Sequence, residues 1–213
     1  QAFFRRVAAT DSNRAASDWI MSKFQEFGYT EVYKDTFYAE VLGSSGTQLC
    51  HNVIAYKEGA CAECIIVVGG HYDGVPGSPA ADDNGSGTAG TLEIARVLSE
   101  IPTEASFLFV AFDDEEAGLH GAEHLSLEIA MGDYLLLYVL NMDMIADEDN
   151  DSDARLYHGE DTYYSEMWDD LANTLVGIDG RLQGSSAGSD HYPFQERGYP
   201  VTFVHEYYFS SVY

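Results

Sequence analysis

The sequence predicts an α/β fold with a mainly parallel central sheet. Three continuous apolar runs, at residues 64–70, 106–112 and 134–140, are typical of strands that are buried on both faces. Segments with helical spacing separate them, so strands and helices alternate from residue 64 onward. The sequence has 213 residues, 46% of them hydrophobic, and shows no internal repeat. This length suits one domain with a substantial core, which we expect to span residues 1–213, with a C-terminus that could be truncated.

The segment before the first buried strand is expected to form one helix and two strands. Apolar residues recur at helical spacing from Asp11, the expected N-cap, to Phe27, and Gly28 ends this helix. Residues 30–39 and 47–57 are rich in β-branched and aromatic side chains on either side of a Gly/Ser turn, which predicts two strands.

The remaining elements follow the buried strands closely. Helices are expected at residues 85–100, 118–130 and 162–175, and a last strand at residues 200–205. Helices that connect successive strands allow those strands to run parallel, which is why the central sheet is expected to be mainly parallel.

The composition is strongly acidic. Thirty-six aspartate and glutamate residues and ten lysine and arginine residues give a formal net charge of −26 at pH 7. This charge argues against nucleic acid or an anionic membrane as a partner. No apolar run reaches the ~18 residues of a membrane span, and residues 1–10 lack the apolar stretch of a signal peptide. The acidic balance suits a secreted or extracellular protein, or a periplasmic one.

The three cysteines are too few for a disulfide framework. Cys61 and Cys64 form a Cys-x-x-Cys motif that precedes a strand, and the chain has no second cysteine pair. A redox pair or half of a zinc knuckle is therefore less favoured than a local disulfide or two thiols in a turn. Cys50 is then unpaired.

The acidic run at residues 147–153 has two interpretations. Asp149, Asp151, Asp153 and Glu160 fit positions 1, 3, 5 and 12 of a calcium loop, but Ala154 replaces the glycine needed at position 6. A solvated acidic loop is therefore favoured, and a Ca²⁺ site stays open as the alternative.

Ligand-type side chains stand at the carboxyl ends of the three buried strands. His71 follows the first strand and Asp143 follows the third. Glu115 and Glu116 follow the second, and Asp82 lies where the next helix begins. Ligands bind at this edge of open α/β sheets, so we expect these side chains to lie close together.

Several carboxylates beside one histidine favour a divalent metal, because without a cation they would repel each other. Zinc accepts imidazole nitrogen and carboxylate oxygen, and a zinc pair needs a bridging carboxylate, for which Asp82 is the natural candidate. Asp73, two residues after His71, is expected to accept the second imidazole N–H. Glu115 and Glu116 point differently, so one can bind metal while its neighbour takes a proton from water.

Four segments carry a family resemblance: HYDGVPGSPAADDNGSGTAGTLEIARVL, FLFVAFDDEEAGLHGAEHL, LNMDMI and GSDHYPFQERGYPVTF. They resemble the di-zinc aminopeptidases of the bacterial leucyl aminopeptidase and aminopeptidase Y type. The resemblance covers the chain from about Ala15 on. It implies a three-layer α/β/α sandwich with a mixed, mainly parallel sheet, and peptide substrates with a free N-terminus.

The resemblance also implies a role for each site residue. His71, Asp143 and Asp82 would hold one zinc ion, and Asp82 and Glu116 would hold the other. Glu115 would be the general base that takes a proton from water, with Asp73 beside it in the catalytic site. A cis peptide bond would join Asp82 to the next residue, Asp83.

One family feature is missing from the sequence. The family has a fifth ligand, a histidine followed by threonine, shortly after the final strand, and residues 203–213 resemble the approach to it. The ligand would lie beyond Tyr213, or His205 or His191 would replace it. His191 resembles the Ser-Asp-His motif of the family, and the second zinc site stays in doubt.

Two alternatives to an aminopeptidase follow from the same fold. One is a single-zinc glutaminyl-cyclase-like enzyme. The segment at residues 82–87 favours the peptidases over this alternative. The other is a catalytically inactive binding domain, against which Glu115 argues. The side chain that the enzyme prefers in its substrate is open. Tyr192, Phe194, Met144 and Tyr207 could line an apolar pocket, which gives a weak expectation of an apolar N-terminal residue in the substrate. The oligomeric state is also open.

Overall fold

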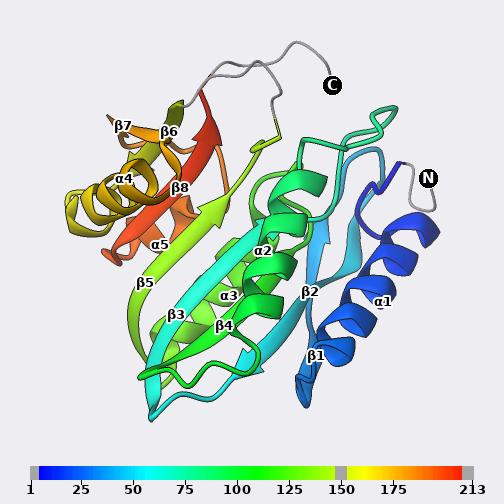
Figure 1. The fold of residues 1–213 in the computed structure, drawn as a ribbon. Coiled ribbons are helices and arrows are strands. Elements are labelled where there is room, and N and C mark those ends of the chain that lie inside the picture. The colour runs from blue at the N-terminus through cyan, green and yellow to red at the C-terminus, as the bar shows by residue number, and fades with distance from the viewer. Residues whose placement is uncertain (1–4, 147–152, 208–213) are drawn as a thin grey trace.

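A computed structural model describes residues 5–146 and 153–207. Eight strands form one sheet in the order β1-β2-β4-β3-β5-β8-β6-β7 (Figure 1). The strands are β1 (Glu31–Glu40), β2 (Thr47–Lys57), β3 (Cys61–His71), β4 (Ala105–Phe112), β5 (Leu135–Met142), β6 (Asp153–His158), β7 (Asp179–Gly184) and β8 (Val201–Glu206). The extent of the domain stays a prediction.

The centre of the sheet is parallel and its edges are mixed. Strands β4, β3, β5 and β8 pair in parallel. Strands β1 and β2 pair antiparallel to each other, β2 pairs antiparallel to β4, and β6 pairs antiparallel to β8 and parallel to β7. This arrangement confirms the mixed, mainly parallel sheet expected from the sequence.

Helices cover both faces of the sheet and form the outer layers (Figure 1). They are α1 (Asp11–Glu26), α2 (Gly85–Leu98), α3 (His120–Met131), α4 (Tyr163–Val176) and α5 (Tyr192–Glu196). Side chains of α1, α2 and α4 pack in one hydrophobic cluster, and those of α3 and α5 pack in another. The two clusters lie on opposite faces of the sheet, which confirms the three-layer α/β/α sandwich.

The sequence missed β6, β7 and α5. Strand β7 contains aspartate, glycine and arginine, which have little preference for strands, and β6 directly follows the acidic run. Both strands exist because they pair with each other and β6 pairs with β8. The N-cap of α1 was also misplaced by one residue, because the Thr10 side chain accepts the Asn13 N–H and Asp11 does not.

The cysteines and the calcium-loop candidates can be compared with the expectations from the sequence. Cys61 and Cys64 form a disulfide, and Cys50 is a buried thiol. Of the calcium-loop candidates, Asp149 and Asp151 lie outside the described residues. Asp153 begins β6 and pairs with the Arg181 guanidinium at 3.2 Å, so this carboxylate already has a cationic partner.

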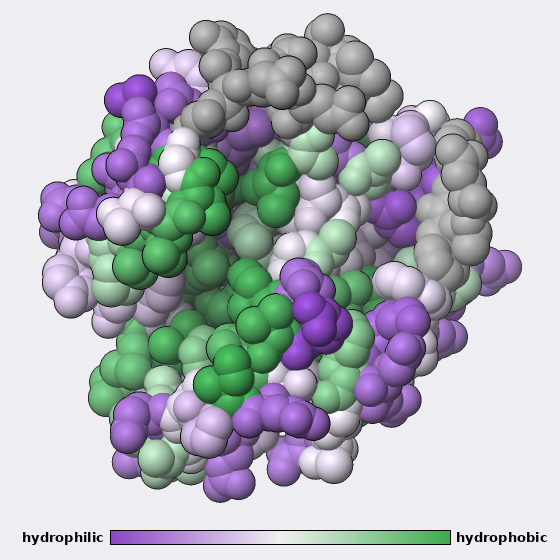
Figure 2. Space-filling model, in the orientation of Figure 1, coloured by the Kyte–Doolittle hydropathy of each residue, from purple (hydrophilic) through white to green (hydrophobic). Residues whose placement is uncertain are grey.

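Hydrophobic side chains remain exposed on α4. Leu171, Leu175 and Val176 are 52%, 74% and 69% exposed, and Ser165 is the buried residue of this helix. Figure 2 shows hydrophobic residues around a hollow between α2 and α4, over β5. No helix in the described part of the chain combines the length and apolar character that a membrane span requires.

Asn84 fixes the start of α2 against the end of β5. Its side-chain N–H donates to the Met142 carbonyl at 2.9 Å, and its side-chain oxygen accepts the Gly87 N–H at 2.8 Å. The side chain is fully buried. Gly70 of β3 permits this close packing, since a Cβ there would lie 2.6 Å from the Met142 carbonyl oxygen. The loop that precedes α2 is therefore held over the carboxyl ends of β3 and β5.

We expect Asn84→Ala to lower the free energy of unfolding of the metal-free protein by about 3 kcal/mol. The substitution removes an N-cap and leaves the buried Met142 carbonyl without its donor. Urea unfolding in the presence of a chelator measures this change. Ser22→Ala is the control, because Ser22 donates one exposed hydrogen bond within α1. Equal, small effects of both substitutions would show that Asn84 does not fix this junction.

Candidate metal centre

The carboxyl ends of β3, β4 and β5 meet at one edge of the sheet. His71 at the end of β3 is the register partner of Phe112 at the end of β4. Gly69 of β3 is the partner of Asn141 of β5. Side chains that follow these three strands therefore converge on His71, as expected for a parallel sheet.

Three carboxylates surround the His71 ring. Its Nε2 lies 3.1 Å from Asp83 Oδ1, 3.5 Å from Asp143 Oδ1 and 3.8 Å from Glu115 Oε2. Within the described residues, three groups could hold a metal ion, with the ligand atoms of each within 4.8 Å of one another, and two of these groups contain His71. One group contains His71, Glu115 and Asp143, and the other contains His71, Asp83 and Glu116.

Several ligand atoms of this cluster are buried without a hydrogen-bond partner among the described residues. These atoms are both ring nitrogens of His71, Oδ1 of Asp143 and Oε1 of Glu116. Buried polar atoms are nearly always hydrogen-bonded in folded proteins. A cation with nitrogen and oxygen ligands would satisfy His71 Nε2 and the two carboxylate oxygens, so the donor set fits zinc, while His71 Nδ1 faces Asp73 Oδ1 at 3.3 Å.

The pKa values of the two glutamates reflect the crowding of charge. Burial raises the pKa of Glu115 to about 9, with His71 opposing the shift and Asp190 and Asp143 adding to it. Burial and the Asp83 carboxylate raise the pKa of Glu116 to about 7. The cluster therefore takes up protons near neutral pH unless a cation neutralises it.

The pKa of His71 is raised, although burial alone would lower the pKa of an imidazole. Burial lowers it, but the charges of Asp143 and Glu115 raise it by more, so the pKa lies well above its ordinary value. The imidazole ring is fully buried. A metal ion would take the place of its proton.

Asp82, expected as the bridging ligand, lies outside both groups. Its carboxylate accepts the backbone N–H of Ala146 at 3.1 Å, and Asp83 occupies the position beside His71. The expected cis bond between Asp82 and Asp83 was also wrong, because the cis peptide joins Asp83 to Asn84. Adjacent aspartates are chemically alike, and the loop conformation decides which one faces the histidine. Asn84, a typical N-cap residue, was the available signal.

Asp73 supports the two glutamates as well as the histidine. Its Oδ1 lies 3.3 Å from His71 Nδ1, as expected, although the two groups lack the alignment of a hydrogen bond. The same carboxylate accepts the backbone N–H of Glu115 at 3.1 Å and of Glu116 at 3.3 Å. Asp73 therefore positions the turn that carries both glutamates.

The four consecutive acids after β4 divide into two pairs. Asp113 is fully buried and accepts hydrogen bonds from the Asn13 side chain and the His51 backbone. Asp114 adopts a positive φ of 59° and contacts His120 at 2.7 Å. This turn directs the two glutamates that follow toward the His71 cluster.

Neither candidate for the fifth ligand joins the cluster. His191 is buried, and its Nε2 lies 3.0 Å from the Ser186 carbonyl oxygen. Burial lowers its pKa to about 4, so the ring is neutral. His205 Nδ1 lies 2.6 Å from the carbonyl oxygen of Glu206. Neither histidine belongs to a metal-binding group within the described residues.

Sequence reasoning missed the residues that orient Asp143. Ser189 donates its hydroxyl to Asp143 Oδ2 at 2.7 Å, and Asn141 donates to Ser189 at the same distance. Asp190 next to Ser189 is fully buried, and burial raises its pKa well above the ordinary value. The Ser-Asp-His motif was the signal that could have identified them.

A cavity of about 340 Å³ opens over the cluster. Asp83, Glu115, Glu116 and Asp143 line it, together with residues of β6 and β8. Acidic ligand atoms and a cavity of this size occur together at this edge of the sheet, so it is the candidate active site.

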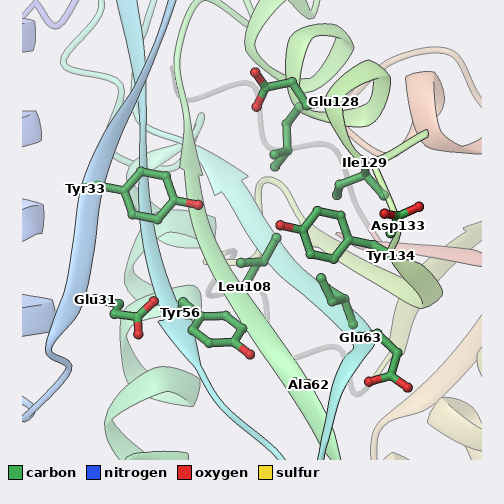
Figure 3. A pocket seen from close by; sticks show the side chains of 12 residues that line it. Glu31, Tyr33, Tyr56, Ala62, Glu63, Leu108, Glu128, Ile129, Asp133 and Tyr134 are labelled. Atoms are coloured by element: carbon green, nitrogen blue, oxygen red, sulfur yellow. The ribbon is translucent and has the colours of Figure 1, made fainter. Parts of the chain in front are cut away.

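A second pocket of about 490 Å³ differs in chemistry. Figure 3 shows Tyr33, Tyr56 and Tyr134 around it, with several acids at its margin. Glu128, one of these acids, belongs to a further acidic group with Asp35 and His124. Asp35 and His124 pair directly at 2.9 Å, so these ligand atoms already have partners and the His71 cluster remains the better candidate.

Comparison with known proteins supports the sequence resemblance. The Aminopeptidase YwaD of Bacillus subtilis (strain 168) is 35% identical over 137 residues, which cover 63% of this chain and 30% of that protein. The Leupeptin-inactivating enzyme 1 of Streptomyces exfoliatus is 26% identical over 197 residues, 88% of this chain and 41% of that protein. The chain thus spans less than half the length of either relative.

Solved structures share the fold. BSAP, a zinc aminopeptidase from Bacillus subtilis, superposes with a TM-score of 0.68 and 30% identity, over 78% of this chain and 41% of that one. An aminopeptidase from Aneurinibacillus sp. strain AM-1 has a TM-score of 0.83 at 18% identity. The match covers 98% of this chain and 83% of that one. A Porphyromonas gingivalis glutaminyl cyclase has a TM-score of 0.73 at 24% identity, and the match covers 96% of this chain and 79% of that one. The last two likenesses show the fold alone.

A protein-family model also matches the chain. The model of peptidase family M28 matches residues 52–213, which is most of the chain and contains the whole His71 cluster. This match confirms the resemblance that the four sequence segments carry, and the chain belongs to peptidase family M28.

Proposed function

We propose that this protein is a metallo-aminopeptidase that hydrolyses the N-terminal peptide bond of peptides. The observation that carries the proposal is the buried cluster of unpartnered ligand atoms around His71, in two groups that share this residue. Membership of peptidase family M28 and the named aminopeptidase relatives support it.

The cluster would hold two zinc ions. His71 and Asp143 would bind one ion and Glu116 the other, with Asp83 between them in the bridging role first expected of Asp82. Bound zinc supplies Lewis acidity, which polarises a peptide carbonyl and lowers the pKa of water.

Glu115 is the proposed general base. Its carboxylate lies 3.8 Å from the His71 ring and lines the cavity, and its raised pKa supports a role as proton acceptor there. Positive charge nearby would lower this pKa and leave the group ionised at neutral pH. Glu115 would accept a proton from the attacking water and donate it to the leaving amine. Asp73 holds the backbone of Glu115 in place during this transfer.

We also propose that the protein is secreted, extracellular or periplasmic. The net charge of −26 and the Cys61–Cys64 disulfide support an oxidising, aqueous compartment. The solvated acidic loop at residues 147–153 stays the favoured prediction, with a Ca²⁺ site as its alternative.

The first test concerns the base. We expect Glu115→Gln to lower kcat for leucine p-nitroanilide by at least ~10³-fold, because amide nitrogen cannot accept the proton. Zinc content, measured by elemental analysis, should stay close to that of the wild type. Glu100→Gln, at an exposed position in the turn after α2, is the control. Retained turnover in the Glu115 variant would rule out the assigned role.

The second test separates two adjacent aspartates. We expect Asp83→Asn to reduce bound zinc and activity strongly, because Asp83 faces His71. Asp82→Asn should leave both nearly unchanged, because its carboxylate meets only the Ala146 N–H among the described contacts. Zinc stoichiometry of the two variants decides between them, and the reverse order of effects would restore Asp82 as the ligand.

The third test uses pH. Glu115 and Glu116, with pKa values of about 9 and about 7, hold protons near neutral pH in the metal-free protein. These protons must leave when zinc binds, so apparent zinc affinity should rise as the pH rises from 6 to 9. Calorimetry at pH 7 in two buffers of different ionisation enthalpy measures the release. Heats that do not depend on the buffer would contradict the protonated state of the cluster.

A further inference from the structure

The cavity over the His71 cluster also contains basic side chains. Arg155 of β6 and His205 of β8 line it together with the four acids. They are register partners in the antiparallel pair β6–β8, so their side chains lie next to each other on one face of the sheet. Tyr157 and Phe203 form the next pair on that face, two residues along each strand, and their rings stack at 5.1 Å.

Arg155 differs from most other basic residues of the chain in its partners. The Arg155 guanidinium lies 5.6 Å from the Tyr207 ring, and no carboxylate lies within ion-pair distance of it among the described residues. Six other basic side chains pair with carboxylates: Arg14, Lys23, Lys34, Arg96, Arg181 and Arg197. In a protein with a net charge of −26, an arginine that lines a cavity and has no carboxylate partner in the described part of the chain is chemically suited to bind an anion from outside the chain.

We propose that Arg155, with His205 beside it, forms a subsite for a carboxylate of the substrate, and that the protein prefers peptides whose N-terminal side chain is acidic. This proposal rests on the aminopeptidase function proposed above. The guanidinium can hold both oxygens of a carboxylate, whereas the neutral amide of glutamine offers only one acceptor. A cavity of about 340 Å³ lies at the small end of ligand pockets, so the carboxylate belongs to the first or second residue of the peptide.

The structure does not support the apolar pocket expected from the sequence. Phe194 is fully buried in the core beneath α3, and the Tyr192 hydroxyl donates to Glu196 on the surface. Met144 does line the cavity, but it shares the wall with Arg155 and His205. The walls therefore combine aromatic rings with positive charge, which matches an acidic side chain with an aliphatic stem.

The test compares α-glutamyl, glutaminyl and leucyl p-nitroanilide on the zinc-loaded 213-residue chain. We expect kcat/KM to be roughly 10-fold higher for the glutamyl than for the glutaminyl substrate. Arg155→Gln should remove this preference, and Arg155→Lys should restore part of it. Arg181→Gln is the matched control, because Arg181 lies on β7 outside the cavity and pairs with Asp153. An equal loss for all three substrates in Arg155→Gln would overturn the proposal.

The carboxylate could also come from the C-terminus of a short peptide. Turnover of Leu-Leu and of its C-terminal amide distinguishes this source. A preference for the free acid that Arg155→Gln abolishes, without a glutamyl preference, would assign the subsite to the C-terminus and overturn the preference for acidic side chains.

A binding measurement keeps the proposal testable if no substrate is turned over. In that case the proposed function fails, and calorimetry with free glutamate and glutamine tests the subsite alone. We expect the wild-type chain to bind glutamate more tightly, and Arg155→Gln to bind both equally. Equal binding of both amino acids to the wild type would exclude the carboxylate subsite.

Discussion

Repulsion among the carboxylates buried around His71 is the constraint on which this edge of the structure depends. Asp83, Glu115 and Asp143 approach one imidazole ring within 4 Å, and Glu116 completes the second group. Burial and neighbouring charge raise the pKa values of both glutamates. Such a cluster can stay ionised at neutral pH only beside positive charge, and a pair of divalent cations supplies it.

The surrounding fold holds these groups in place against that repulsion. Asp73 accepts the backbone N–H groups of both glutamates, and Ser189 fixes Asp143. Asn84 joins the loop that carries Asp83 to the end of β5. The parallel strands thus bring the ligands to one edge, and buried hydrogen bonds orient them there. This support agrees with a site whose geometry is set before a ligand arrives.

Much of the fold could be predicted because its central strands are continuous apolar runs. β3, β4 and β5 lie close to their predicted ranges, and parallel pairing then places His71, the two glutamates and Asp143 together. The choice between Asp82 and Asp83 could not be predicted, because it depends on the conformation of one loop. Strands β6 and β7 depend on pairing at the sheet edge, and β6 carries Arg155, so the polar wall of the cavity was also missed.

The most direct test of the metal centre is the crystal structure of the zinc-loaded protein with anomalous diffraction at the zinc edge. We expect two peaks ~3.5–4 Å apart. One should lie beside His71 and Asp143 and the other beside Glu116, with Asp83 in contact with both. A peak at Asp35 and His124, or no peak beside His71, would contradict a zinc pair held by the His71 cluster.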